Sequence, residues 1–97
     1  MEEFFDFGSA IRYVKAGEKV CRKGWNGKGM YVYINRGSSE NIDNKIDGIP
    51  RYLFDLCEQG SATRLPNFNM VSASGAIVTG WLASQTDMLA EDWCIAE

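Results

Sequence analysis

The stretch Met30–Ile34, with the sequence Met-Tyr-Val-Tyr-Ile, is the clearest strand in the chain. β-Branched and aromatic residues favour strands, where they pack well on a pleated surface. Alternate residues of a strand point to opposite faces, which places Met30, Val32 and Ile34 on one face and the two tyrosines on the other. Both faces are rich in apolar groups, so we expect both to be at least half-buried.

Upstream of this strand, the sequence predicts one helix and one short strand. Asp6 is a preferred N-cap residue for a helix that runs to about Ala16, and Gly17 follows where a C-capping glycine belongs. Lys19–Arg22 is typical of a short strand. The apolar residues of the helix fall on one stripe, at Phe7, Ile11 and Val14.

Downstream, the sequence predicts three further strands or strand fragments and a short helix. Strands are expected near Asn67–Val71 and Ala76–Trp81, joined by a hairpin turn at Ser72–Gly75. Ser84 is suited to cap a short helix, and Trp93–Ile95 is expected to form a last short strand. Connections this short imply hairpins and therefore an antiparallel sheet.

The middle of the chain interrupts this pattern. Residues 35–48 are polar and lack periodicity, which predicts a long loop. Pro50 is placed to begin a second helix that ends at Gly60. We therefore expect an α+β fold, a small antiparallel sheet with an N-terminal helix and one or two short helices. It forms a single domain over residues 1–97, with a polar loop or insert at about 35–64.

Length and composition exclude several classes of protein. A chain of 97 residues fits one domain. The absence of histidine excludes Ser-His-Asp and Cys-His nucleophile systems and histidine-containing zinc sites. The three cysteines lack C-x-x-C spacing, so we expect no metal site and no cofactor. Their odd number, with no signal peptide or long apolar run, indicates a reducing compartment and a cytoplasmic protein with no membrane span.

The net charge of −3 conceals a basic segment. Residues 12–28 contain six basic residues and one acidic residue, a net +5. Such a segment can form a site for an anion, but it also fits a solvated helix face followed by a lysine-rich edge strand. It could bind nucleic acid, with Trp25, Tyr31 and Tyr33 stacking on bases. The overall negative charge argues against a general polyanion binder.

Within the basic segment, Gly24–Gly29 is a glycine-rich loop. It is not a P-loop, because Arg22 stands where the first glycine is required and Gly29 where a serine or threonine is required. Backbone N–H groups and Lys28 can still meet an anion there. The alternative is a tight loop whose Trp25 is anchored in the core.

A second polar cluster, Ser84–Asp87, lies at the start of the last helix. Unpaired backbone N–H groups and the positive end of the helix dipole favour polar ligand groups there. Helix capping alone explains Ser84 and Asp87. It leaves the side chains of Gln85 and Thr86 available to bind a ligand. Asp87, Glu91 and Asp92 are also expected together on this short helix, where Asp87 and Glu91 share a face at i, i+4. Paired carboxylates can act as a general acid and base, although surface carboxylates are the simpler interpretation.

Two strings carry a resemblance to a known family. RKGWNGKGM at residues 22–30 and WLASQTDMLAEDW at residues 81–93 resemble the signature stretches of a small phage-associated family, the Thoeris anti-defence sponges of the second type. The opening FGSA at residues 7–10 also fits the usual start of that family. The resemblance covers about residues 6–34 and 65–95, and the polar insert between them matches no family string.

The resemblance implies a role without catalysis. Members bind the signalling nucleotide that an infected bacterium makes, a glycocyclic ADP-ribose isomer, and hold it without cleaving it, so the defence effector stays inactive. Some relatives also capture cyclic di- or trinucleotides at a separate site. The family further implies a homodimer or homotetramer with ligand sites at subunit interfaces, in the cytoplasm of the bacterial host.

Carried over residue by residue, the resemblance assigns ligand binding to eight positions. They are Trp25, Asn26, Gly27 and Met30 in the first string, and Ser84, Gln85, Thr86 and Asp87 in the second. Trp25 and Met30 would contact a base. Asn26 and the Gly27 backbone would contact phosphate or ribose. The hydroxyl and amide groups of the second string would add hydrogen bonds, and Asp87 would bind a ribose hydroxyl or hold the loop.

Two other functions remain open from the sequence. One is a nucleic-acid or host-protein binding module that uses the basic segment 12–28. The other is a small hydrolase that uses Asp87 and Glu91. The remaining tryptophans of the second string, Trp81 and Trp93, are expected to pack in the core rather than to bind a ligand.

Overall fold

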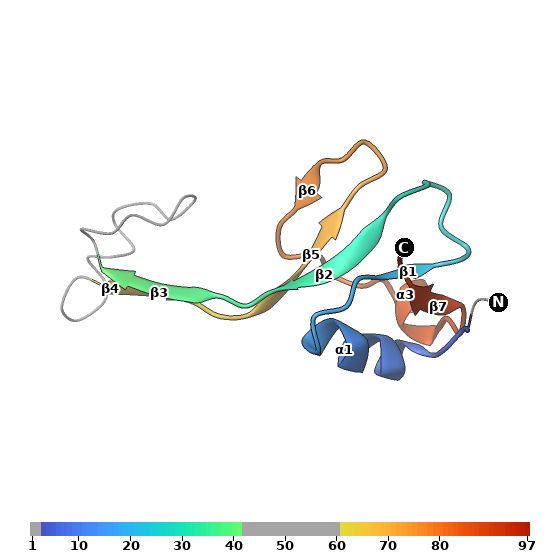
Figure 1. Ribbon diagram of the computed structural model, residues 1–97, viewed down its shortest axis with the longest axis horizontal. Helices are drawn as coiled ribbons and strands as arrows, with labels where there is room; N and C mark the ends of the chain where they lie inside the picture. Colours follow the sequence, from blue (N-terminus) through green and yellow to red (C-terminus); the bar gives the residue numbers. More distant parts are fainter. Residues whose placement is uncertain (1–2, 42–60) are drawn as a thin grey trace. The chain divides into compact units, whose positions relative to one another are not determined.

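The structure is a computed structural model that describes residues 3–41 and 61–97. The helix expected between Pro50 and Gly60 lies outside the described residues. The elements in chain order are α1 (Phe7–Lys15), β1 (Val20–Arg22), β2 (Tyr31–Asn35), β3 (Ser38–Asn41), β4 (Ser61–Arg64), β5 (Asn67–Val71), β6 (Ile77–Val78), α3 (Gln85–Leu89) and β7 (Trp93–Ile95) (Figure 1).

The chain divides into two compact units. One contains Met1–Asn35 and Asn67–Glu97, and the other contains Arg36–Pro66. In the second unit β3 and β4 pair antiparallel, from Ser38 opposite Arg64 to Asn41 opposite Ser61. The expectation of a loop throughout residues 35–48 is therefore wrong for Ser38–Asn41. Its polar sequence lacks apolar alternation, and the strand forms through its backbone pairing with β4.

The first unit contains a five-stranded sheet in the order β6-β5-β2-β1-β7. Each of its strand pairs in the described residues is antiparallel. Val32 at the centre lies opposite Val20 on one side and Met70 on the other. With the N-terminal helix and the short α3, this sheet confirms the expected α+β class.

Helix α1 begins and ends where its capping residues predict. The Asp6 side chain accepts a hydrogen bond of 2.9 Å from the Ser9 backbone N–H. After the C-cap Ala16, Gly17 adopts a φ of 101°, which favours glycine. The buried residues of the helix are Ala10 and Val14. The expected stripe missed Ala10, which is buried in the core cluster.

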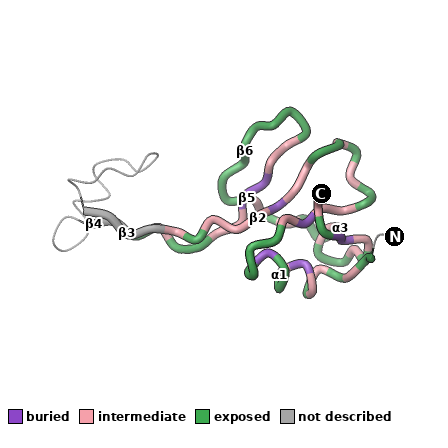
Figure 2. Tube along the Cα trace, in the orientation of Figure 1, coloured by how far each residue is buried: buried purple, intermediate pink, exposed green. Residues whose placement is uncertain are grey.

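The core lies between α1 and one face of the sheet. Ala10 and Val14 pack there against the sheet residues Val20, Val32, Met70 and Trp93, and the buried segments of both layers are visible in Figure 2. The indole of Trp93 is completely buried. Trp81 packs against this cluster, with ring centroids 6.3 Å from Trp93. The expected core positions of both tryptophans are confirmed.

Two expectations about the strands are wrong. The strand expected over Ala76–Trp81 is only the two residues Ile77–Val78. Gly80 turns the chain with a φ of 73°, and its backbone N–H binds the buried Asn69 side chain at 2.8 Å. The basic strand Val20–Arg22 is not at the edge of the sheet, because it pairs with both β2 and β7.

Candidate functional site

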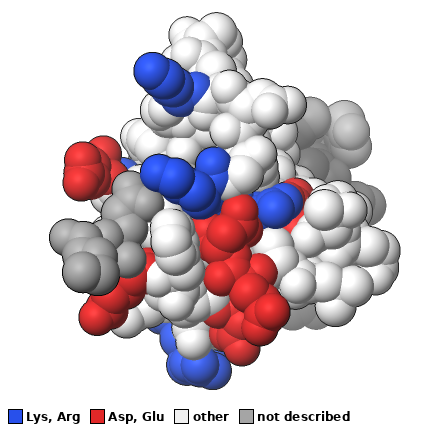
Figure 3. Space-filling view, turned by 90° about the vertical axis from the view of Figure 1, so that its right-hand side faces the viewer, with Lys and Arg blue, Asp and Glu red and all other residues white. Residues whose placement is uncertain are grey.

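The loop of residues 23–30 joins two neighbouring strands, β1 and β2, and is held by an arginine fork. Arg22 at the end of β1 donates from Nε to Asp92 Oδ1 at 2.8 Å and from Nη1 to Asp87 Oδ1 at 2.7 Å. Two planar donors on two carboxylates fix the orientation of the guanidinium. On the face shown in Figure 3, basic and acidic side chains lie beside one another.

The two carboxylates then hold the loop itself. Asp92 Oδ2 accepts from the Gly24 backbone N–H at 2.8 Å, and Asp87 Oδ1 accepts from Trp25 Nε1 at 3.2 Å. The backbone and the indole of the loop are thus tied to residues near the end of the chain. A loop ordered before a ligand arrives loses less entropy on binding.

The hydrogen bonds of this network shift the pKa values of its members. The hydrogen bond from Arg22 holds the pKa of Asp92 below its ordinary value, against a smaller effect of burial. Burial raises the pKa of Asp87, but the hydrogen bonds from Arg22, Trp25 and Ser84 together outweigh it, so that this pKa is lowered as well. The bonds to Asp92 and Asp87 raise the pKa of Arg22. All three groups are therefore charged at neutral pH.

A pocket of about 620 Å³ lies beside the loop. Its lining comes from β1, the loop, the start of β2, β7 and the residues after β7. Cys21, Tyr31 and Cys94 of this lining alternate along their strands with Val20, Val32 and Trp93, which face the core. The pocket therefore occupies the sheet face opposite α1.

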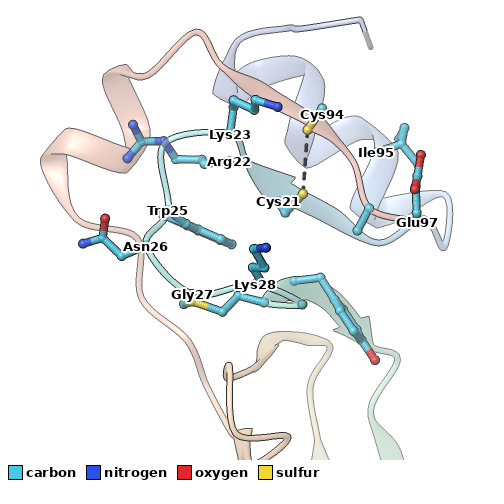
Figure 4. Close-up of a pocket in the computed structure, with 14 residues that line it drawn as sticks. Cys21, Arg22, Lys23, Trp25, Asn26, Gly27, Lys28, Cys94, Ile95 and Glu97 are labelled. Atoms are coloured by element: carbon cyan, nitrogen blue, oxygen red, sulfur yellow. Dashed lines mark hydrogen bonds between the residues drawn. The ribbon is translucent and has the colours of Figure 1, made fainter. Parts of the chain in front are cut away.

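The pocket wall combines an aromatic ring with amines. Trp25, Lys23 and Lys28 all line it, and an acidic residue, Glu97, lines it too. In Figure 4 the Lys28 side chain points into the space, whereas the Arg22 guanidinium points away from it. That guanidinium is ion-paired with Asp87 and Asp92. The pocket can thus offer a ring face for stacking, ammonium groups for an anion and a carboxylate for hydroxyl groups.

The structure brings together the whole first set of predicted ligand residues. Trp25, Asn26, Gly27 and Met30 all line the pocket. A Cβ atom on Gly27 would lie 2.7 Å from Ala73 Cβ and 2.7 Å from Met30 Sδ, so a side chain there would displace its neighbours. Trp25 also packs on the core, with its ring centroid 5.3 Å from that of Trp93. Its two expected roles, pocket wall and core anchor, are therefore compatible.

The second predicted set is placed differently. Ser84 caps α3, and its Oγ accepts from the Asp87 backbone N–H at 3.1 Å. Gln85 and Thr86 are exposed, and none of these three is among the described residues that line the pocket. Asp87 alone is connected to it, through Arg22 and Trp25. It therefore holds the loop, one of the two roles expected for it.

The expected acid–base pair on the last helix is not formed. Helix α3 ends at Leu89 because Ala90 is extended, with φ −72° and ψ 149°. Glu91 therefore does not share a helix face with Asp87, whose carboxylate instead binds Arg22. In the described chain, Asp87 is instead ion-paired with Arg22 of strand β1.

Several residues of the site were not singled out from the sequence. Arg22 and Asp92 form the fork, and Cys21 and Cys94 lie side by side with their sulfurs 3.7 Å apart. All four depend on the pairing of β1 with β7, which are about 70 residues apart in the chain. The sequence signals near them were the net +5 of residues 12–28 and the two family strings, which contain Arg22 and Asp92.

The described residues contain neither a metal-binding cluster nor a membrane-spanning helix. Among residues 3–41 and 61–97, no group of three or more His, Cys, Asp or Glu side chains is arranged to hold a metal ion. No helix in the same residues has the length and apolar character needed to cross a bilayer.

The chain is similar to known proteins over almost its whole length. Residues 5–96 match the family model described as the Thoeris anti-defense 2-like domain. A protein of Bacillus phage SP01 named Thoeris anti-defense 2 is 30% identical over 95 residues, which cover 98% of each chain. Both matches confirm the resemblance carried by the two sequence strings, and they support a phage anti-defence role. The chain belongs to the Thoeris anti-defense 2-like family.

Proposed function

We propose that this protein is an anti-defence sponge, which binds a cyclic nucleotide immune signal of the glycocyclic ADP-ribose type and holds it without cleaving it. Cyclic di- or trinucleotides are further candidate ligands. The observation that carries the proposal is the pocket beside residues 23–30, where Trp25 lies with Lys23 and Lys28. An adenine ring needs a stacking surface and a pyrophosphate needs cations, and this pocket supplies both.

The size and order of the pocket suit such a ligand. Its volume of about 620 Å³ lies within the range of roughly 300–1,000 Å³ typical of small-molecule sites. The fork of Arg22 with Asp87 and Asp92 holds the loop at its backbone and at its indole. A sponge must bind tightly to compete with the effector, and a preorganised wall favours tight binding.

The described chemistry supports retention of the ligand rather than turnover. The chain has no histidine to act as a base near neutral pH. The two carboxylates nearest the loop, Asp87 and Asp92, are ion-paired with Arg22 and are held in the charged form. We therefore propose that the protein is not an enzyme.

A second copy of the chain is part of the proposal. Ser84, Gln85 and Thr86 lie outside the pocket of their own subunit. They can contact the same ligand only if it is bound in the pocket of a second subunit that packs against them. We propose a homodimer or homotetramer in the cytoplasm of the bacterial host, with ligand shared between subunits. Light scattering over a range of protein concentrations tests the oligomer directly, and a monomer at all concentrations would contradict it.

The structure favours this function over a nucleic-acid module. The basic segment does not form one continuous surface: Arg12 lies on α1 and binds Ser9 at 2.9 Å, and Arg22 is neutralised by two carboxylates. Lys23 and Lys28 line the pocket on the opposite sheet face. A polyanion binder should lose affinity steeply with salt, whereas a small nucleotide bound by stacking should lose far less.

The deciding experiment is release of the ligand by heat. The protein is incubated with a glycocyclic ADP-ribose isomer, freed of unbound ligand by filtration and then heat-denatured. Recovery of the intact isomer in amounts that match the protein supports sequestration. Recovery of a degraded product would show turnover and exclude a sponge, and recovery of nothing would exclude binding. Protein denatured before incubation is the matched control for carry-over.

A further inference from the structure

Two cysteines face each other on the floor of the pocket. Cys21 of β1 and Cys94 of β7 are direct partners in the sheet register. Their Sγ atoms are 3.7 Å apart, and both residues line the pocket. Cys94 is 6% exposed, and Cys21 is half-buried. The two strands bring together thiols that are 73 residues apart in the chain.

The backbone around the pair sets its geometry. The Ala96 N–H donates to the Lys19 carbonyl at 2.8 Å, and the Lys23 N–H donates to the Asp92 carbonyl at 3.0 Å. These bonds lie two residues to either side of Cys21, so Cys21 and Cys94 occupy a hydrogen-bonded position of the antiparallel ladder. The Cα atoms of such positions are about 5.5 Å apart. That separation lies within the range of roughly 4.4–6.8 Å that disulfides span.

We propose that Cys21 and Cys94 are a redox-sensitive dithiol, which a low-molecular-weight disulfide such as glutathione disulfide converts to a cross-strand disulfide. The sulfurs must move from 3.7 Å to about 2.05 Å. Side-chain rotation is sufficient for this change, because the expected Cα separation already suits the bond. The pocket is the route by which the oxidant reaches the thiols, and Lys23 and Lys28 on its wall attract an anionic oxidant.

The reaction proceeds by two exchanges. The more exposed Cys21, as thiolate, attacks one sulfur of glutathione disulfide, which forms a protein–glutathione mixed disulfide and releases one glutathione. The Cys94 thiolate then attacks Cys21 Sγ, breaks the mixed disulfide and releases the second glutathione. The protein pair loses two electrons, glutathione disulfide gains them, and the two thiol protons end on the released glutathione molecules.

The product would link β1 to β7 covalently beside the fork. Arg22 follows Cys21 in β1, and Asp92 lies two residues before Cys94. A disulfide there joins the strand that carries the arginine to the segment that carries its partner. Oxidation therefore acts on the same two chain segments that order the pocket loop.

The test uses a Cys57→Ser background, which leaves only the two cysteines of the pair; residue 57 lies outside the described residues. Reduced, folded protein is treated with excess glutathione disulfide, quenched in acid, alkylated and weighed by mass spectrometry. We expect the loss of two hydrogen atoms, no alkylation and no retained glutathione, with reversal by dithiothreitol. Peptide mapping should link Cys21 to Cys94.

Three results would overturn the inference. The first is alkylation of both thiols after oxidant treatment. The second is a stable glutathione adduct on one cysteine with the other still a free thiol. The third is a covalent dimer on a non-reducing gel. Cys94→Ser in the same background is the matched control. It removes the resolving thiol, so Cys21 should retain glutathione, and failure of Cys21 to react would overturn the proposed order of attack.

A ligand-protection experiment separates the dithiol from the proposed function. Only this experiment rests on the proposed function. If the nucleotide occupies the pocket, a concentration of about ten times Kd should slow oxidation roughly tenfold, because only unliganded protein reacts. Disulfide formation without protection would place the nucleotide elsewhere and leave the dithiol intact. Absence of the disulfide in nucleotide-free protein overturns the dithiol whatever the nucleotide does.

Discussion

At the scale of single residues, Trp25 connects the core to the pocket. Its ring packs edge-on against Trp93 and Trp81, with centroid distances of 5.3 and 6.2 Å. Its Nε1 donates to Asp87, and the residue also lines the pocket. The indole is therefore held by packing and by a hydrogen bond at the wall of the pocket. Small shifts of this ring are opposed by three neighbours.

The first prediction concerns this ring. Trp25→Ala should weaken binding of a glycocyclic ADP-ribose isomer by at least about 1 kcal/mol, because base stacking on an aromatic side chain contributes roughly 1–3 kcal/mol per base. Isothermal titration calorimetry measures the change. Trp81→Phe is the matched control, since Trp81 packs on the same cluster but does not line the pocket. Equal affinities of Trp25→Ala and the unaltered protein would remove Trp25 from the site.

At the scale of elements, α3 is too short to be stable alone, and its ends are anchored. Ser84 caps its first turn, and the Trp93 indole donates to the Asp87 carbonyl at 2.9 Å. Helices shorter than about 12 residues are marginal in isolation, and α3 has five. Its function in the described unit is to present Asp87 to Arg22 and Trp25. The cap of α3 therefore helps to hold Asp87 where it binds Arg22 and the indole of the loop residue Trp25.

The second prediction separates capping from ligand binding at Ser84. Ser84→Ala should lower the free energy of unfolding by about 1 kcal/mol, as loss of an N-cap hydroxyl does. Urea denaturation measures this. Ser84→Asn keeps a capping acceptor and should restore most of the loss, and Thr86→Ala, at an exposed position of the same turn, should change stability little. Unchanged stability of Ser84→Ala would contradict the cap.

At the scale of the whole molecule, the fork joins segments from opposite ends of the chain. Arg22 binds carboxylates that lie 65 and 70 residues away. The same pairing of β1 with β7 carries the two cysteines. A contact between segments this far apart depends on the pairing of β1 with β7, so we expect its loss to lower the free energy of unfolding of the whole unit.

The third prediction is the pH dependence of that stability. The folded-state pKa values of Asp87 and Asp92 are lowered, so their contribution is complete above the unfolded pKa and is lost as the pH falls through the folded pKa. The free energy of unfolding should therefore decline below about pH 4. Urea denaturation followed by tryptophan fluorescence at several pH values measures the decline.

The matched comparison for pH is Arg22→Met. Without the guanidinium the two carboxylates lose their main hydrogen-bond donor, so this variant should be less stable at neutral pH and should lose less stability on acidification. Asp6, whose pKa is lowered by the Ser9 backbone N–H, titrates in both proteins and cancels. The same acid-dependent loss in both proteins would show that the fork does not cause it. Lys28→Met removes a cation that does not lower the pKa of Asp6, Asp87 or Asp92, so this control should retain the full pH dependence.

The local signals in the sequence determined most of the elements. Capping residues located α1 and the start of α3, and strand composition located β2, β5 and β7. The resemblance also grouped the first set of predicted ligand residues, from Trp25 to Met30, which line one pocket in the structure. These residues lie next to one another in the chain, so one loop brings them to one pocket.

The order of the strands in the sheet was decided only by the tertiary structure. The sequence placed the basic strand at an edge and Asp87 beside Glu91. In the sheet, β1 lies between β2 and β7, and Asp87 binds Arg22. The fork and the facing cysteines both arise from this pairing. Helix capping and strand alternation depend on residues that are close in the sequence, so the sequence shows them directly. The pairing of distant strands depends on the burial of the whole core, which forms only in the tertiary structure.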